Sequence, residues 1–262
     1  MKHLFFDAGG TILDLEYGHL RDVWRAVADG GAPSADAMPD DDAFSRAEWT
    51  ARAWYLGWVR EGRVPLDAWR GYYDRIYAGV GTPEAVRPQV VSALWDRNVS
   101  KGLWHRPAPG AADLLGRLKA RGFRLAVISN AEGRIAADLA EAGLAGFFET
   151  IVDSHIEGVT KPDPRLFRIA LERVGARAEE SLYIGDIYWI DVAGARAAGL
   201  SPVLIDRWRL QRDMTDCPRV ENYAELEAML PASPGARYIP IRSAYCSGED
   251  SKASRLLPDE KK

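Results

Sequence analysis

Four short segments of this 262-residue chain place carboxylates, a hydroxyl and an ammonium after apolar runs or beside a proline. In chain order, the polar residues in these segments are Asp7, Ser129 with Asn130, Lys161, and Asp186 with Asp191. Such groups can attack an electrophilic centre, hold a divalent cation and neutralise an anion. Because the carboxyl ends of parallel strands meet at one edge of an open α/β sheet, we expect the four segments to converge there.

Each segment also has a plain structural explanation when it is considered alone. Asp7 precedes two glycines, which is ordinary turn chemistry, and Ser129 could cap the helix that follows it. A single lysine such as Lys161 is most often a solvated surface charge. Asp186 and Asp191 form the stronger pair, because two acids held together without a cation are costly. The functional interpretation therefore depends on the order and placement of all four segments.

The elements that would position these residues alternate between strands and helices. Apolar runs predict strands at residues 4–6, 123–128, 147–152, 182–184 and 203–205, and amphipathic segments predict helices at 111–121, 134–142, 164–174 and 191–198. This alternation indicates right-handed βαβ units and a parallel sheet. We therefore predict an α/β fold with a Rossmann-like core formed by residues 1–14 and 106–232.

Residues 15–105 have a different character, with apolar and aromatic side chains at helical spacing and several prolines between them, namely Pro33, Pro39, Pro65 and Pro83. An insertion of this length is too long for a structureless loop. We predict an all-helical cap domain, with a loop at 37–42. Its aromatic residues Tyr17, Trp54, Tyr55, Trp58 and Trp69 either form the core of the cap, which we favour, or line a substrate pocket.

The remaining composition narrows the class of protein. Residues 233–262 are rich in Pro, Gly, Ser and charge, and we expect a flexible tail. A formal net charge of −4 gives no reason to expect nucleic-acid binding, and no stretch reaches the roughly 18 apolar residues of a membrane span. Two cysteines, scattered histidines and no signal-peptide pattern favour a cytoplasmic protein. We expect a monomer or homodimer.

These segments resemble the motifs of the haloacid dehalogenase-like (HAD) hydrolase superfamily, in the haloacid dehalogenase/phosphatase-like subgroup with a helical cap inserted after the first motif. The resemblance covers about residues 2–230. It implies Mg²⁺-dependent hydrolysis of a small phosphorylated metabolite through an aspartyl-phosphate. Asp7 would be the nucleophile, and Lys161 would neutralise the phosphate and orient Asp7.

The resemblance also implies the residues that bind phosphate and metal. Phosphate would be bound by Thr11, Ser129, Asn130 and Lys161. Mg²⁺ would be held by Asp7, the backbone carbonyl of Gly9, Asp186 and Asp191. For Asp191 a second role stays open, because it could hold Lys161 instead of the water shell of the metal.

Gly9 departs from the pattern of the phosphatases in this superfamily. They carry a second aspartate at this position, two residues after the nucleophile, which serves as general acid and base. Such catalysis is typically worth about 10² to 10⁴ in rate, so we expect a steep dependence of rate on the leaving group. If another residue serves as the acid, His19, Asp14 and Glu16 are the first candidates.

Two alternative functions stay open. Haloacid dehalogenases of the superfamily also lack the second aspartate, but Asp186 would repel a haloacid carboxylate unless a cation intervened. A catalytically weak protein that binds phosphate or a partner is the other alternative. Phosphonate hydrolases, which use a cap lysine, are nearly excluded because no lysine lies between Ile12 and Ser100.

Overall fold

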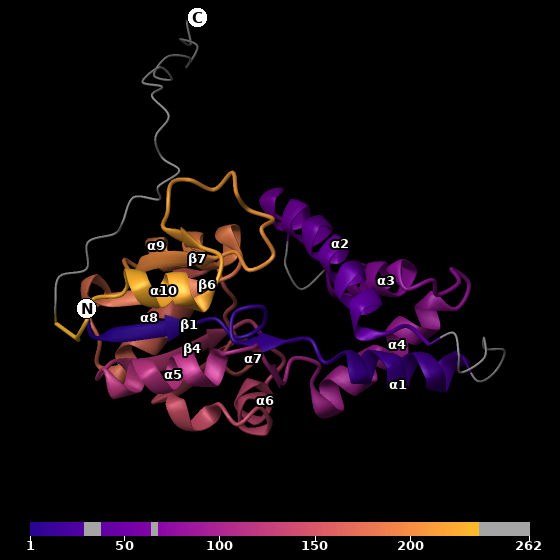
Figure 1. Cartoon of the computed structure of the whole chain (residues 1–262), viewed down its shortest axis with the longest axis horizontal. Helices are drawn as coiled ribbons and strands as arrows, with labels where there is room; N and C mark the ends of the chain where they lie inside the picture. Colours follow the sequence, from indigo (N-terminus) through magenta and orange to yellow (C-terminus); the bar gives the residue numbers. More distant parts are fainter. Residues whose placement is uncertain (29–37, 64–67, 236–262) are drawn as a thin grey trace, which may run out of the picture.

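The computed structural model describes residues 1–28, 38–63 and 68–235. Two prolines expected to separate cap helices, Pro33 and Pro65, lie outside the described residues, as does most of the expected tail, residues 236–262. Figure 1 shows two bodies side by side, an α/β core at the left and a helical cap at the right.

The core is built on a six-stranded sheet in which every strand pairing is parallel. In spatial order its strands are β5 (Thr150–Asp153), β4 (Arg124–Ser129), β1 (His3–Phe6), β6 (Ser181–Gly185), β7 (Ser201–Ile205) and β8 (Arg219–Val220). The predicted α/β fold is therefore confirmed. The crossover from β1 through the cap to β4 leaves the first strand at the centre of the sheet.

Both faces of the sheet are covered, which explains the continuous apolar character of the strands. Alternate residues of a strand point to opposite faces, so Leu4 and Phe6 enter one hydrophobic cluster while Phe5 enters another. The helices of the core are α5 (Ala111–Ala120), α6 (Ile135–Glu141), α7 (Ser154–Glu157), α8 (Pro164–Val174), α9 (Ala193–Ala197) and α10 (Tyr223–Met229).

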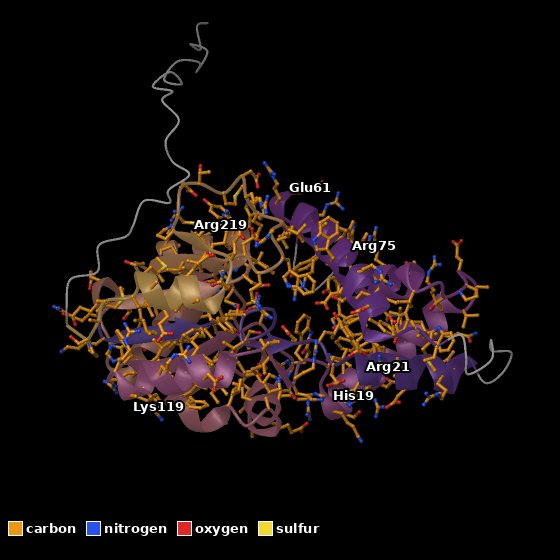
Figure 2. The ribbon with its side chains drawn as sticks, viewed as in Figure 1. His19, Arg21, Glu61, Arg75, Lys119 and Arg219 are labelled. Atoms are coloured by element: carbon orange, nitrogen blue, oxygen red, sulfur yellow. The ribbon has the colours of Figure 1, made fainter. Side chains whose placement is uncertain are left out.

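The cap contains the helices α1 (Tyr17–Ala28), α2 (Asp41–Arg60), α3 (Trp69–Gly79) and α4 (Arg87–Lys101). It has its own hydrophobic cluster, in which Trp24, Tyr73 and Tyr77 are buried. Charged side chains such as Arg21, Glu61 and Arg75 cover its outer surface (Figure 2). The boundaries of the two domains stay a prediction.

Three details differ from the sequence expectation. The chain enters and leaves the cap through a two-stranded antiparallel ribbon, β2 (Leu13–Asp14) with β3 (Arg106–Pro107), which was not predicted. The helix expected at 191–198 begins earlier, as a π-helix over Tyr188–Val192. Strand β8 and helix α10 were not predicted, because two and seven residues are too short for a periodic signal. No helix in the described part of the chain is long and apolar enough to cross a membrane.

Candidate active site

The register of the sheet brings the polar segments together. Phe6 lies opposite Val127 of β4 and Ile184 of β6, so the residues after these positions meet at one edge of the sheet. The backbone N–H of Asp7 continues this pattern by donating to the carbonyl of Ile184 (2.8 Å). On either side of Asp7, Ser129 is the last residue of β4 and Asp186 directly follows β6.

Lys161 is the centre of a buried polar network around Asp7. Its side chain is 2 % exposed, and Nζ lies 2.5 Å from Asp7 Oδ1 and 2.8 Å from Asp191 Oδ1. Nζ also donates to the hydroxyl of Tyr183 (2.9 Å), which in turn donates to Asp191 Oδ1 (2.9 Å). Burial alone would lower the pKa of Lys161, but the charges of Asp191 and Asp7 outweigh it and raise the pKa. Lys161 is therefore a cation at neutral pH.

Asp7, Asp186 and Asp191 present carboxylate oxygens that all lie within 4.8 Å of one another. Burial, opposed by Lys161, raises the pKa of Asp7 to about 6. Burial also raises the pKa of Asp186 to about 7, with Asp7 and Asp191 adding to the effect. The cluster has an excess of negative charge, because its three acids face two cations, Lys161 and Arg52. Clustered oxygen ligands with unbalanced negative charge fit a divalent cation such as Mg²⁺.

Arg52 reaches this cluster from helix α2 of the cap. Its Nη1 donates to Asp186 Oδ2 (2.8 Å), and its Nε donates to Glu48 Oε1 (2.9 Å). The guanidinium also lies over the rings of Trp104 (5.4 Å) and Trp208 (4.8 Å). Arg52 therefore ties the cap to the cluster of acids at the sheet edge. Arg52 was not among the predicted site residues, because an arginine on an amphipathic helix resembles any surface charge.

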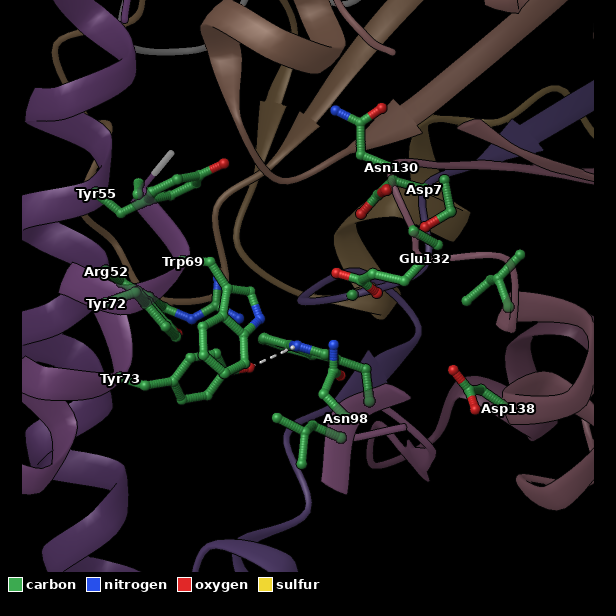
Figure 3. Close-up of a pocket in the computed structure, with 17 residues that line it drawn as sticks. Asp7, Arg52, Tyr55, Trp69, Tyr72, Tyr73, Asn98, Asn130, Glu132 and Asp138 are labelled. Atoms are coloured by element: carbon green, nitrogen blue, oxygen red, sulfur yellow. Dashed lines mark hydrogen bonds between the residues drawn. The ribbon is translucent and has the colours of Figure 1, made fainter. Parts of the chain in front are cut away.

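A cavity of about 200 Å³ opens between the cap and the sheet edge (Figure 3). Residues of the expected site form its base, namely Asp7, Gly9, Ser129 and Asn130. Aromatic residues of the cap form its wall, namely Tyr55, Trp69, Tyr72, Tyr73 and Trp104. Asn98, Glu132 and Asp138 line the remaining side. Of the cap aromatics proposed for a pocket, Tyr55 and Trp69 thus line this cavity, whereas Trp54 and Trp58 contact each other.

Thr11 and Asp191 of the expected site do not line the cavity, and hydrogen bonds hold them and Asn130 in place. Thr11 is fully buried and donates from Oγ1 to Asp7 Oδ2 (3.2 Å). The side chain of Asn130 forms two hydrogen bonds to the backbone of Lys161: Nδ2 donates to the carbonyl (3.0 Å), and Oδ1 accepts from the N–H (2.7 Å). Asp191 accepts the N–H of Ile187 with Oδ2 (2.9 Å) and holds Lys161 with Oδ1. Phosphate binding by Thr11, Ser129 and Asn130 stays a prediction.

The three candidates for a replacement acid do not line this cavity. Asp14 is paired with Arg207 (2.8 Å), and Glu16 accepts the N–H of Gly18 (2.9 Å). His19 contacts the carbonyl of Gly102 through Nδ1 (3.1 Å). The structure therefore directs attention to acids that do line it, Glu132 and Asp138.

Gly9 has a steric explanation in the position of Trp104. A Cβ at Gly9 would lie 3.3 Å from Cε3 and 3.4 Å from Cδ2 of the indole. The indole is held in place because its Nε1 donates to the hydroxyl of Tyr73 (3.2 Å), as the dashed line in Figure 3 shows. The indole of Trp104 thus packs tightly against the position that a Cβ at residue 9 would occupy.

We therefore expect Gly9→Asp to lower the free energy of unfolding by about 1–3 kcal/mol, the usual cost of overpacking. Chemical denaturation of the parent and the variant measures this. Gly146→Asp is the matched control, because a Cβ at Gly146 meets nothing within 4 Å. Equal stability of Gly9→Asp and the parent would show that Trp104 does not exclude a side chain at position 9.

Comparison with known proteins agrees with this geometry. A family model described as haloacid dehalogenase-like hydrolase matches residues 1–199, so the chain belongs to the HAD-like hydrolases. The chain is 35 % identical over 228 residues to a protein of Thermus thermophilus named phosphoserine phosphatase, covering 79 % of this chain and 89 % of that one. It is 32 % identical over 133 residues to a glyceraldehyde 3-phosphate phosphatase of Methanothermobacter thermautotrophicus, covering 48 % of this chain and 59 % of that one.

Solved structures support the same fold. The HAD-hydrolase YfnB from Bacillus subtilis, bound to magnesium, superposes with a TM-score of 0.64 at 22 % identity, covering 87 % of this chain and 97 % of that one. A HAD phosphatase from Thermococcus onnurineus gives a TM-score of 0.58 at 21 % identity, covering 89 % and 100 %. At these identities the likeness concerns the fold alone.

Proposed function

We propose that this hydrolase cleaves a small phosphate monoester through an aspartyl-phosphate on Asp7, with Mg²⁺ as its cofactor. The observation that carries the proposal is the buried cluster of Asp7, Asp186 and Asp191, in which Lys161 bridges the first and the last. Similarity to proteins named as phosphatases of small phosphorylated compounds supports the same reaction class.

The residues around Asp7 suggest how it is prepared for attack. Lys161 holds Oδ1 closely, whereas Thr11 donates to Oδ2 over a longer distance, so Oδ2 is the candidate nucleophilic oxygen. Attack would form a bond from Oδ2 to phosphorus and break the bond from phosphorus to the ester oxygen. Water would then cleave the acyl phosphate and regenerate the carboxylate.

Two of the clustered acids and the backbone of Gly9 would provide the ligands of Mg²⁺. Asp7 and Asp186 would hold it, together with the carbonyl of Gly9. Bound Mg²⁺ offsets the repulsion between an anionic nucleophile and an anionic phosphate. Because both oxygens of Asp191 already accept hydrogen bonds, we infer that it positions Lys161.

A substrate screen tests the reaction class. Phosphoserine, glyceraldehyde 3-phosphate and other phosphorylated compounds of three or four carbons suit a cavity of about 200 Å³. We expect release of inorganic phosphate that requires Mg²⁺ and stops in EDTA. Full activity in EDTA would remove the metal from the proposal.

The metal site can be tested without turnover. Asp186→Asn removes one charged ligand, and we expect the affinity for Mg²⁺, measured by calorimetry, to fall at least about tenfold, equivalent to about 1.4 kcal/mol. The variant should stay folded, because Arg52 keeps its ion pair with Glu48. Asp216→Asn, at an exposed acid paired with Arg196, is the control and should bind Mg²⁺ as the parent does. Equal affinity in Asp186→Asn would place the metal elsewhere.

One observation favours dehalogenation as a second candidate function. Asp186, which would repel the carboxylate of a haloacid, is paired with the buried guanidinium of Arg52. The cation that a dehalogenase would need is therefore present. Halide release from a 2-haloacid in EDTA, without phosphatase activity, would favour this alternative over the phosphatase.

A further inference from the structure

The carboxylate of Glu132 is a partly buried charge on the cavity wall for which the described residues provide no balancing cation. Burial raises its pKa, and the neighbouring charges that act on it are those of Asp153 and Asp138, which raise it further. Buried carboxylates are normally paired. Other charges around the cavity follow this rule, since Asp138 pairs with Arg134 (3.1 Å) and Arg52 pairs with Asp186 (2.8 Å).

Asn98 of helix α4 provides a second, independent sign of a missing partner. Its side chain is 4 % exposed and lines the same cavity, yet its Nδ2 donates to no acceptor among the described residues. The amide lies close enough to Glu132 to lower the pKa of that carboxyl. Figure 3 shows the polar atoms of Asn98 and Glu132 directed toward the same part of the cavity. A buried N–H without a partner costs free energy unless a ligand places a hydrogen-bond acceptor beside it.

The surroundings of Glu132 and Asn98 indicate which chemical group of a ligand would contact them. Glu132 lies two residues after Asn130, in the loop that follows β4, so it lines the same cavity as the nucleophile Asp7. The aromatic side chains of Trp69, Tyr73 and Trp104 form the facing wall. A carboxylate, an amide and aromatic rings around one space are the surroundings that an ammonium group favours.

We propose that Glu132 binds a primary ammonium group of the substrate and that Asn98 Nδ2 donates to an oxygen of the same substrate, so that the preferred substrates are phosphate monoesters of amino alcohols, among them hydroxyamino acids. The proposal rests on the proposed phosphatase function and assigns its substrate class. The ammonium supplies the positive charge that Glu132 lacks, while Asn98 orients the substrate through its amide. Both residues act on recognition of the substrate.

Matched substrates test this assignment. Phosphoserine and 3-phosphoglycerate differ in an amino group against a hydroxyl, as phosphoethanolamine and 2-hydroxyethyl phosphate do. We expect the parent to favour the amino ester in kcat/KM by about 10- to 100-fold. Glu132→Gln should reduce this preference to within about 3-fold, chiefly by raising KM for the amino ester. Glu141→Gln, which removes a charge from the exposed face of α6, is the control and should keep the parent preference.

A binding experiment separates this proposal from the proposed function. In an Asp7→Asn background, calorimetry should show tighter binding of phosphoserine than of 3-phosphoglycerate, and Glu132→Gln should remove the difference. This result would support ammonium recognition even if the parent hydrolysed no phosphate ester. Circular dichroism checks the fold of each variant, and Glu132→Asp, which withdraws the carboxylate by one methylene, replaces Glu132→Gln if the latter does not fold.

Two results would overturn the assignment. One is a parent enzyme that neither binds nor turns over the amino esters better than their hydroxyl counterparts. The other is a Glu132→Gln variant that loses kcat equally for both members of a pair, with larger losses for poorer leaving groups. That pattern would make Glu132 the proton donor that replaces the aspartate absent at Gly9.

Discussion

Asp7→Asn should abolish turnover, with a loss on the order of 10⁴-fold or more, the scale seen when a nucleophile is removed. An amide nitrogen or carbonyl oxygen in place of the carboxylate cannot form the acyl phosphate at a useful rate. The substitution also removes one negative charge from the proposed metal site. Both effects act on the same chemical step, so we expect no rescue by a higher substrate or Mg²⁺ concentration.

The fold of Asp7→Asn should survive, because the amide can use the same contacts. Its Oδ1 can still accept from Lys161, and Nδ2 can donate to the hydroxyl of Thr11, which reverses the hydrogen bond seen with Asp7. Phosphate release and circular dichroism should be measured on the same preparation. Asp153→Asn is the matched control, because this aspartate also ends a strand at the sheet edge but caps backbone N–H groups. If Asp7→Asn retained activity within tenfold of the parent, Asp7 would not be the nucleophile.

Lys161→Met should reduce both activity and stability. Removing one member of a buried ionic network leaves uncompensated charge, and the usual cost is about 3–5 kcal/mol of unfolding free energy. Here two carboxylates, Asp7 and Asp191, would each lose a bond to Nζ of 2.5 and 2.8 Å. We expect the rate to fall about 10²- to 10³-fold as well, as for other lost electrostatic contacts to a reacting phosphate or nucleophile.

Denaturant unfolding and phosphate release measure the two effects of Lys161→Met separately. Lys119→Met is the control, because Lys119 lies on the outer surface of the core in Figure 2 and donates to the carbonyl of Gly146 (3.0 Å). The double variant Lys161→Met with Asp191→Asn should recover part of the lost stability, since it removes one of the two carboxylates that Lys161→Met leaves unpaired. Unchanged stability in Lys161→Met would contradict the network described here.

The sequence by itself determined the class of fold and the base of the site. Apolar runs that end abruptly in Asp7, Ser129 and Asp186 mark the carboxyl ends of buried parallel strands, and such ends converge whatever the detailed packing. The register of β1 with β4 and β6 then places Asp7 between the ends of its two neighbouring strands. The insertion between the first strand and the others was equally visible, because its helical periodicity contrasts with the alternation that follows.

Only the tertiary structure decided which cap residues reach the site. Arg52 is 134 positions from Asp186 in the chain, and nothing in its helix distinguishes it from other arginines. Tyr183 resembles any aromatic residue of a buried strand until its hydroxyl meets Lys161. Likewise, Trp104 explains Gly9 and Asn98 accompanies Glu132 only because the cap docks on the sheet edge. Local sequence patterns encode the period and the ends of each element, whereas contacts between the two bodies depend on their packing, which has no local signal.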